Sequence, residues 1–111
     1  MVHEPLPSAK QARLIILATG QSIPLTGQQM LVGRQTSPPL AEVDIRLADR
    51  TLSRYQAYLR NRQGTFTVET HPSSVSGNCL NGILLERHRE YELKHGDLLR
   101  LAAVEVRFEM D

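Results

Sequence analysis

The 111-residue sequence lacks the features that mark several large classes of protein. Its single cysteine, Cys79, can form no internal disulfide and belongs to no zinc-binding pattern, and this favours a reducing, cytoplasmic setting. No apolar run approaches the roughly 20 residues that a membrane-spanning helix needs. Residues 1–10 also contain no apolar stretch of the signal-peptide kind, so the sequence predicts neither a membrane protein nor a secreted one.

An excess of charge of one sign is also missing. Thirteen Lys and Arg residues stand against twelve Asp and Glu, which gives a formal net charge of +1. This balance argues against a general grip on nucleic acid, although it leaves room for a local basic patch. Aromatic residues make up only 5% of the chain, and we expect both phenylalanines, Phe66 and Phe108, to be buried. Few aromatic side chains therefore remain for stacking on single-stranded bases, and nucleic-acid binding is the most distant of the alternatives.

The chain shows no pattern of catalytic or metal-binding residues. Its four histidines lack ligand spacing and are scattered over the sequence: His3, His71, His88 and His95. A serine hydrolase would need a base and an orienting acid near its nucleophile, but Ser53 is followed by Arg54, which cannot act as a base. We therefore expect no enzyme activity, no metal and no cofactor.

The dominant sequence period is two, which indicates β-strands. Residues 104–110 alternate between apolar and polar, and the apolar run at residues 13–19 is typical of a strand buried on both faces. Further strands are expected at residues 21–25, 28–32, 44–47, 57–60, 65–69, 91–93 and 98–101. Residues 35–43 and 70–79 read as long loops, and a short helix at residues 84–93 is the weaker alternative to the strand at residues 91–93.

This pattern predicts an all-β fold, an antiparallel β-sandwich or a barrel. The length fits one domain. We place that domain at residues 11–111 and interpret residues 1–10, with Pro5 and Pro7, as a flexible tail or linker within a larger multidomain protein.

Two arginines stand beside small residues at expected strand ends. Gly33-Arg34 ends one strand, and Ser53-Arg54 precedes another about twenty positions later. A guanidinium binds a dianion through paired, charge-assisted hydrogen bonds and keeps its proton at every relevant pH. Two such groups and a hydroxyl on loops at one end of a rigid scaffold favour phosphate binding over catalysis.

The order of these motifs resembles that of a forkhead-associated (FHA) domain. The resemblance runs from about residue 13 to residue 110 and rests on these segments: Gly33-Arg34, residues 44–47, Ser53-Arg54-x-x-Ala57, a Ser/Gly/Asn loop, Leu80-Asn81-Gly82, residues 96–101 and residues 104–108. It implies a β-sandwich of about eleven short strands that reads phosphothreonine in signalling partners through loops at one end.

The resemblance also implies roles for individual residues. Arg34 would contact the phosphate or the backbone beside it, Ser53 would hydrogen-bond a phosphate oxygen, and Arg54 would hold the peptide backbone or the phosphate. Gly33, Asn81 and Gly82 would support the site. Gln56 stands where the family usually has histidine and would tie the loops together from behind, because an amide both donates and accepts.

The second binding loop departs from the family pattern. An ungapped count places Val75 at the usual hydroxyl position, Ser76 at the asparagine and Gly77 at the glycine. A two-residue deletion would instead place Asn78 at the asparagine. Ser76 and Asn78 are therefore both candidate binding residues. These departures leave open a degenerate FHA domain that acts as a scaffold and binds its partners without phosphate.

Overall fold

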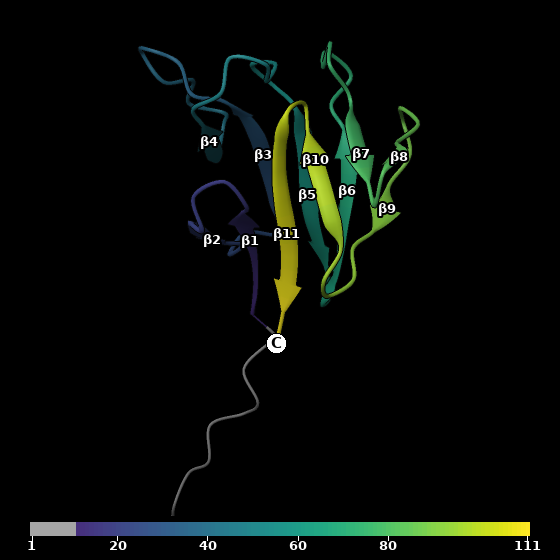
Figure 1. The fold of residues 1–111 in the computed structure, drawn as a ribbon. Coiled ribbons are helices and arrows are strands. Elements are labelled where there is room, and N and C mark those ends of the chain that lie inside the picture. Colours follow the sequence, from purple (N-terminus) through teal and green to yellow (C-terminus); the bar gives the residue numbers. More distant parts are fainter. Residues whose placement is uncertain (1–10) are drawn as a thin grey trace, which may run out of the picture.

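The computed structural model describes residues 11–111, which form eleven β-strands and no helix (Figure 1). The tail predicted at residues 1–10 lies outside the described residues. The strands are β1 (Ala12–Ile16), β2 (Ser22–Pro24), β3 (Gln29–Arg34), β4 (Ile45–Leu47), β5 (Ala57–Arg62), β6 (Thr65–Thr70), β7 (Asn78–Leu80), β8 (Ile83–Leu84), β9 (Tyr91–Glu92), β10 (Leu98–Leu101) and β11 (Val104–Met110).

The strands form two sheets that pack face to face, as the sequence predicted. One sheet has the order β2-β1-β11-β10-β7-β8, and the other has the order β4-β3-β5-β6-β9. Every pairing is antiparallel except that of β3 with β4, which is parallel. The long connection at residues 35–44 carries the chain back along the sheet before β4, so the two strands run in the same direction.

The core lies between the sheets and follows the period of two. Along β11, Val106 and Phe108 are fully buried whereas Glu105 is exposed. The Phe108 ring meets Phe66 of the opposite sheet with 5.5 Å between ring centroids. Burial of each such side chain contributes about 1.5–3 kcal/mol, so this alternating pattern drives the packing of the two sheets.

Two local predictions from the sequence were wrong, and a third alternative was not realised. The first strand ends at Ile16, and Arg13 and Ile15 are only half-buried because the outer face of the sheet at β1 is uncovered. Residues 70–79 contain the end of β6 and all but the last residue of β7. The helix that was the weaker alternative at residues 84–93 does not form: these residues contain the end of β8, a turn and β9, and β9 corresponds to the strand expected at residues 91–93.

Two hairpins close through two-residue turns in which both residues have positive φ. These pairs are Gln63-Gly64 (φ 55° and 92°) and Asn81-Gly82 (φ 50° and 84°). Such turns match the twist of the flanking strands and favour Asn and Gly at these positions, so both hairpins follow from the sequence.

The register places several loops at one end of the sandwich. Ala57, the first residue of β5, pairs with both Val32 near the end of β3 and Thr70 at the end of β6. The loops at residues 48–56 and 71–77 therefore meet at the end that is uppermost in Figure 1. No helix long and apolar enough to cross a membrane occurs in residues 11–111.

Candidate functional site

A groove of about 500 Å³ opens at this loop end. The groove brings together Arg34, Ser53 and Arg54, which we selected from the sequence as candidate binding residues. It is also lined by residues that we did not select. The full lining is Arg34, Arg50, Thr51, Leu52, Ser53, Arg54, Tyr55, Ser73 and Val75. Three of these side chains are cationic and none is acidic.

Arg34 is fixed at the floor of the groove by the end of β3. Its backbone N–H donates to the Ser53 carbonyl oxygen at 3.0 Å. Its side chain is half-buried, and Nη1 donates to the Leu52 carbonyl oxygen at 3.1 Å. A guanidinium has five N–H donors, so this bond orients the side chain and leaves donors for a ligand.

Gly33 allows the two arginine-bearing segments to come together. A Cβ atom built on Gly33 would overlap the Arg54 carbonyl oxygen and would lie 3.2 Å from Val43 Cγ2. Gly33 lies inside β3 and its φ is not positive, so no turn explains the glycine at this position. The close approach of the Arg54 backbone is what requires a residue without a side chain.

Ser53 faces the groove with its hydroxyl already oriented. Its Oγ accepts a hydrogen bond from the Val75 backbone N–H at 2.9 Å. A hydroxyl that accepts in this way keeps its own hydrogen available for donation to an anion. The bond also joins the loop at residues 48–56 to the loop at residues 71–77.

Gln56 lies beneath the groove and is fully buried. Its Oε1 accepts from the Ser53 backbone N–H at 2.8 Å, and its Nε2 donates to the Gly77 carbonyl oxygen and to Asn78 Oδ1, both at 2.9 Å. The side chain thus connects the two loops from behind, at the position where the resemblance placed a supporting residue.

Asn78 points into the interior. Its side chain is 1% exposed, and its Nδ2 donates to Thr70 Oγ1 at 3.0 Å and to the Gln56 carbonyl oxygen at 3.3 Å. Ser76 is exposed but does not line the groove, and its Oγ donates to Gln56 Oε1 at a long 3.3 Å. Val75 is 89% exposed and does line the groove.

Asn81 and Gly82 lie at the far end of β7 from the groove. Asn81 Oδ1 accepts from the Leu98 backbone N–H at 2.8 Å, and its Nδ2 donates to Asp97 Oδ1 at 3.0 Å. These bonds join the β7–β8 turn to the start of β10. They act on the position of β7 and do not touch the residues that line the groove.

Arg50 and Arg54 are exposed on the loop that forms one wall of the groove. Within residues 11–111, neither they nor Arg34 form an ion pair with a carboxylate. The loop is held in place because Thr51 Oγ1 accepts from the Ala103 backbone N–H at 3.1 Å. Sequence reasoning missed Arg50, because the contact that holds its loop beside the groove joins residues 52 positions apart.

Three tilted rings lie close together beside the groove at Tyr55. The His71 ring lies 5.3 Å from that of Tyr55 and 5.1 Å from that of Tyr58, measured between centroids. Partial burial lowers the pKa of His71 below its usual value. Its Nδ1 accepts from the Ser73 backbone N–H at 3.0 Å, which requires that nitrogen to be unprotonated.

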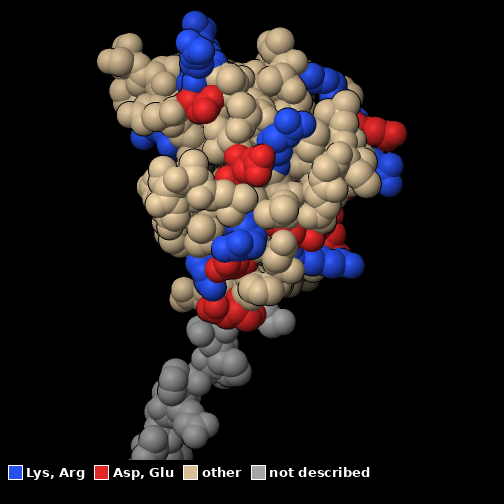
Figure 2. Space-filling view, viewed as in Figure 1, with Lys and Arg blue, Asp and Glu red and all other residues tan. Residues whose placement is uncertain are grey.

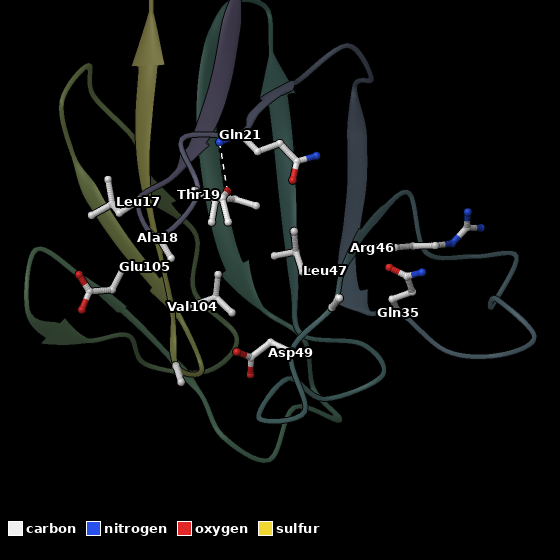
Figure 3. Close-up of a pocket in the computed structure, with 13 residues that line it drawn as sticks. Leu17, Ala18, Thr19, Gln21, Gln35, Arg46, Leu47, Asp49, Val104 and Glu105 are labelled. Atoms are coloured by element: carbon white, nitrogen blue, oxygen red, sulfur yellow. Dashed lines mark hydrogen bonds between the residues drawn. The ribbon is translucent and has the colours of Figure 1, made fainter.

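A larger cavity of about 690 Å³ opens where the β1–β2 turn, β4 and the start of β11 meet (Figure 3). Its polar side chains carry both signs, with Arg46 on one side and Asp49 and Glu105 toward the other. Positive charge is therefore not concentrated there as it is in the groove. No cluster of three metal-ligating side chains occurs in the described part of the chain.

Comparison with known proteins agrees with this geometry. The FHA domain profile matches residues 30–102. Comparison with curated protein sequences gives no match.

Solved structures show the same fold. EmbR of Mycobacterium tuberculosis, in complex with a low-affinity phosphopeptide, superposes with a TM-score of 0.77 at 23% identity; the match covers 89% of this chain and 24% of EmbR. Pml1p of yeast gives 0.77 at 26% identity over 92% of this chain and 83% of its own.

The MEK1 FHA domain, in complex with a phosphothreonine peptide of HOP1, gives a TM-score of 0.70 at 27% identity and covers 90% of this chain and 96% of its own. The chain thus spans about a quarter of EmbR but nearly all of the isolated FHA domain. The chain belongs to the FHA domain family, because the FHA domain profile matches residues 30–102 and the chain has the motif order and the two sheets of that fold.

Proposed function

We propose that residues 11–111 form a module that binds a phosphothreonine-containing segment of a partner protein in the groove at the loop end. The observation that carries this proposal is the groove lining, which surrounds one space with Arg34, Ser53 and Arg54 and contains no carboxylate. A phosphate carries about −1.5 to −2 charges at neutral pH and accepts hydrogen bonds at three oxygens.

The three residues take distinct roles in this proposal. Arg34 donates its free guanidinium N–H groups to the phosphate, because its side chain is already oriented by Leu52. Ser53 donates its hydroxyl hydrogen to a phosphate oxygen. The Val75 backbone N–H donates to Ser53 Oγ and so holds the hydroxyl group in place. Arg54, which is exposed, holds the phosphate or the peptide backbone beside it.

Ser76, in the loop at residues 71–77, and Asn78, just after that loop, take different roles in this proposal. Ser76, exposed just outside the groove lining, is our candidate for contact with the peptide backbone. We assign Asn78 to support of the site together with Gln56, because both of its side-chain polar atoms are bonded inside the protein. Gly33 supports the site through the close approach of Arg54, and Asn81 and Gly82 support it indirectly through β7.

Val75 supplies a reason for a preference for threonine. Its side chain is 89% exposed at the groove, an unusual environment for an apolar residue, and it lies beside the Ser53 hydroxyl. A methyl group on the phosphorylated residue would cover part of this surface. Burial of one methyl-sized group contributes about 0.8 kcal/mol, so the preference over phosphoserine should be about fourfold.

The relatives support a phosphorylated protein as the partner. EmbR is seen with a phosphopeptide and the MEK1 FHA domain with a phosphothreonine peptide, on a fold that this chain shares. Two or three charge-assisted hydrogen bonds contribute about 3–9 kcal/mol, whereas micromolar binding requires about 8 kcal/mol. The phosphate contacts are then a large part of the binding free energy, which makes phosphorylation an effective signalling switch.

An array of paired peptides, each with threonine and with phosphothreonine, tests the proposal on the wild-type chain. We expect a subset of phosphopeptides to bind with micromolar affinity and their unphosphorylated partners to bind at least about 100-fold more weakly. The alternative, a scaffold that binds without phosphate, predicts equal affinity within each pair. That result, or an array without any bound phosphopeptide, would overturn the proposal.

A further inference from the structure

We propose that the groove reads a second anionic group in the same phosphopeptide, and that Arg50 is the residue that contacts it. The inference rests on the proposed function and adds to it a class of partner, a phosphothreonine with an acidic or phosphorylated residue nearby. It begins from the charge that lines the groove.

The groove holds more positive charge than one phosphate needs. Arg34, Arg50 and Arg54 contribute three positive charges, and no acidic side chain lines the groove. A phosphate contributes at most two negative charges. The whole chain has a net charge of only +1, so this concentration is a local feature and not a reflection of a basic protein.

The surface as a whole carries mixed charge. Figure 2 shows basic and acidic side chains interspersed over one face of the molecule, the loop end at the top included. The larger cavity beside the groove is lined by Arg46 but also by Asp49 and Glu105. The groove is therefore distinguished from its neighbour by the absence of acids as well as by its arginines.

The side chain of Arg50 is exposed on the loop that forms one wall of the groove. Within residues 11–111 it forms neither an ion pair nor a hydrogen bond. The adjacent carboxylate, Asp49, accepts hydrogen bonds from Thr51, and these bonds lower the pKa of Asp49 more than the nearby charge of Arg50 does. Asp49 is thereby committed to shaping the turn.

The backbone that carries Arg50 is held firmly beside the groove. The Thr51 backbone N–H donates to Asp49 Oδ1 at 2.8 Å, and the Leu52 N–H donates to the Asp49 carbonyl oxygen at 3.3 Å. Thr51 Oγ1 also accepts from the Ala103 N–H at 3.1 Å, which ties the turn to the β10–β11 connection. Arg50 thus projects from an anchored turn three residues before Ser53, on the wall next to the phosphate position.

The chemistry that suits an exposed, unpaired guanidinium is a carboxylate or a second phosphate. For an exposed pair we expect a gain of about fivefold in affinity from a carboxylate, and a larger gain from the doubly charged phosphate. A carboxylate and a second phosphate would make the same contact with Arg50, and peptides that carry one or the other distinguish them.

The test uses one phosphothreonine peptide with neutral flanks and two derived sets. In one set a single aspartate, and in the other a single phosphoserine, replaces each position within four residues of the phosphothreonine. Fluorescence anisotropy at constant ionic strength gives the dissociation constants for the wild type, Arg50→Ala and Arg50→Glu. Arg89→Ala is the matched control, since Arg89 is an exposed arginine that does not line the groove.

We expect the wild type and Arg89→Ala to prefer an added acid at one or two positions, by about fivefold for aspartate and more for phosphoserine. Arg50→Ala should lose this preference, so that it binds the neutral-flank and acidic-flank peptides with equal affinity. Arg50→Glu should reverse the preference, so that lysine at the same position binds more tightly than aspartate.

Equal affinity of the wild type for neutral and acidic flanks would overturn this inference and leave phosphothreonine binding intact. A preference for acids that survives in Arg50→Ala would also overturn it, because another residue would then be the reader. A wild type that fails to bind even the neutral-flank phosphopeptide removes the proposed function and this inference together.

Discussion

The side chains of Gln56 and Asn78 bond to each other in the interior beneath the groove, with Gln56 Nε2 2.9 Å from Asn78 Oδ1. Both side chains are at least 99% buried. The pair joins the loop that carries Ser53 and Arg54 to the start of β7, and all their buried side-chain polar atoms find partners. The geometry of the groove thus depends on an amide network that never reaches its surface.

Gln56→Ala should destabilise the protein strongly. It leaves the Ser53 N–H, the Gly77 carbonyl and Asn78 Oδ1 without their partner, and each buried unsatisfied group costs about 1–3 kcal/mol. We expect the free energy of unfolding, measured by urea titration, to fall by about 3 kcal/mol or more. Ser76→Ala is the control, because its exposed hydroxyl makes only a 3.3 Å contact, and should change stability by less than about 0.5 kcal/mol. Equal effects of the two variants would show that the amide network is not structural.

Gly33→Ala should damage both stability and the groove. The added methyl group would overlap the Arg54 carbonyl oxygen, and backbone cannot move aside as a side chain can. We expect a loss of about 3 kcal/mol, at the upper end of the range for overpacked sites, together with weaker phosphopeptide binding. Gly64→Ala separates the effect of the clash from that of backbone strain, because its φ is +92° but no atom lies within 4 Å of the added group. It should cost about 1 kcal/mol and leave the affinity unchanged.

The sequence was sufficient for the fold but only in part for the groove. Alternation along residues 104–110 is a local signal and predicted β11 correctly, and the Asn81-Gly82 turn is likewise set by two adjacent residues. Strand β7 was missed because Asn78, Cys79 and Leu80 have little strand propensity of their own. They become a strand because β10 and β8 pair with them on either side.

The roles of Asn78 and Arg50 could not be predicted from the sequence. An asparagine in a Ser/Gly-rich loop has the same sequence signature whether it faces a ligand or the interior, and only the packing of Gln56 and Thr70 around it decides. Arg50 enters the groove because Thr51 anchors its turn to Ala103, a contact between residues 52 positions apart. Long-range contacts of this kind leave no local pattern in the sequence.

Val75→Ser should reduce the preference for phosphothreonine over phosphoserine. If the exposed valine covers the threonine methyl group, the wild type should prefer phosphothreonine by about fourfold, and the variant should bind both peptides almost equally. Isothermal titration with two peptides that differ only in this methyl group measures the ratio. A ratio that is the same in both proteins would show that the methyl group lies elsewhere.

Arg60, Arg62 and Glu90 form an ion network on the outer face of the second sheet. This network should make the free energy of unfolding depend on pH. The Glu90 carboxylate accepts hydrogen bonds from Arg62, Thr67 and Arg60. These bonds lower the pKa of Glu90, and the bond from Arg62 has the largest effect. A carboxyl with a lowered pKa in the folded state stabilises that state above its unfolded pKa of about 4.3, and the contribution is lost as the pH falls through the folded value.

Denaturant titrations from pH 7 to pH 3 check this expectation. The stability of the wild type should fall more steeply below about pH 5 than that of Glu90→Gln, whose side chain does not titrate. Glu92→Gln is the control, because Glu92 is exposed and forms no ion pair within residues 11–111. Identical slopes for the wild type and Glu90→Gln would contradict the prediction.

The affinity of Arg34→Ala for a phosphothreonine peptide that the wild type binds tests the central claim most directly. Isothermal titration should show binding weakened by about 100-fold or more, since at least two charge-assisted hydrogen bonds are lost. Arg89→Ala should bind like the wild type, and a thermal melt should show that both variants are folded. Binding by folded Arg34→Ala within twofold of the wild type would contradict the account, because the groove would then not hold the phosphate.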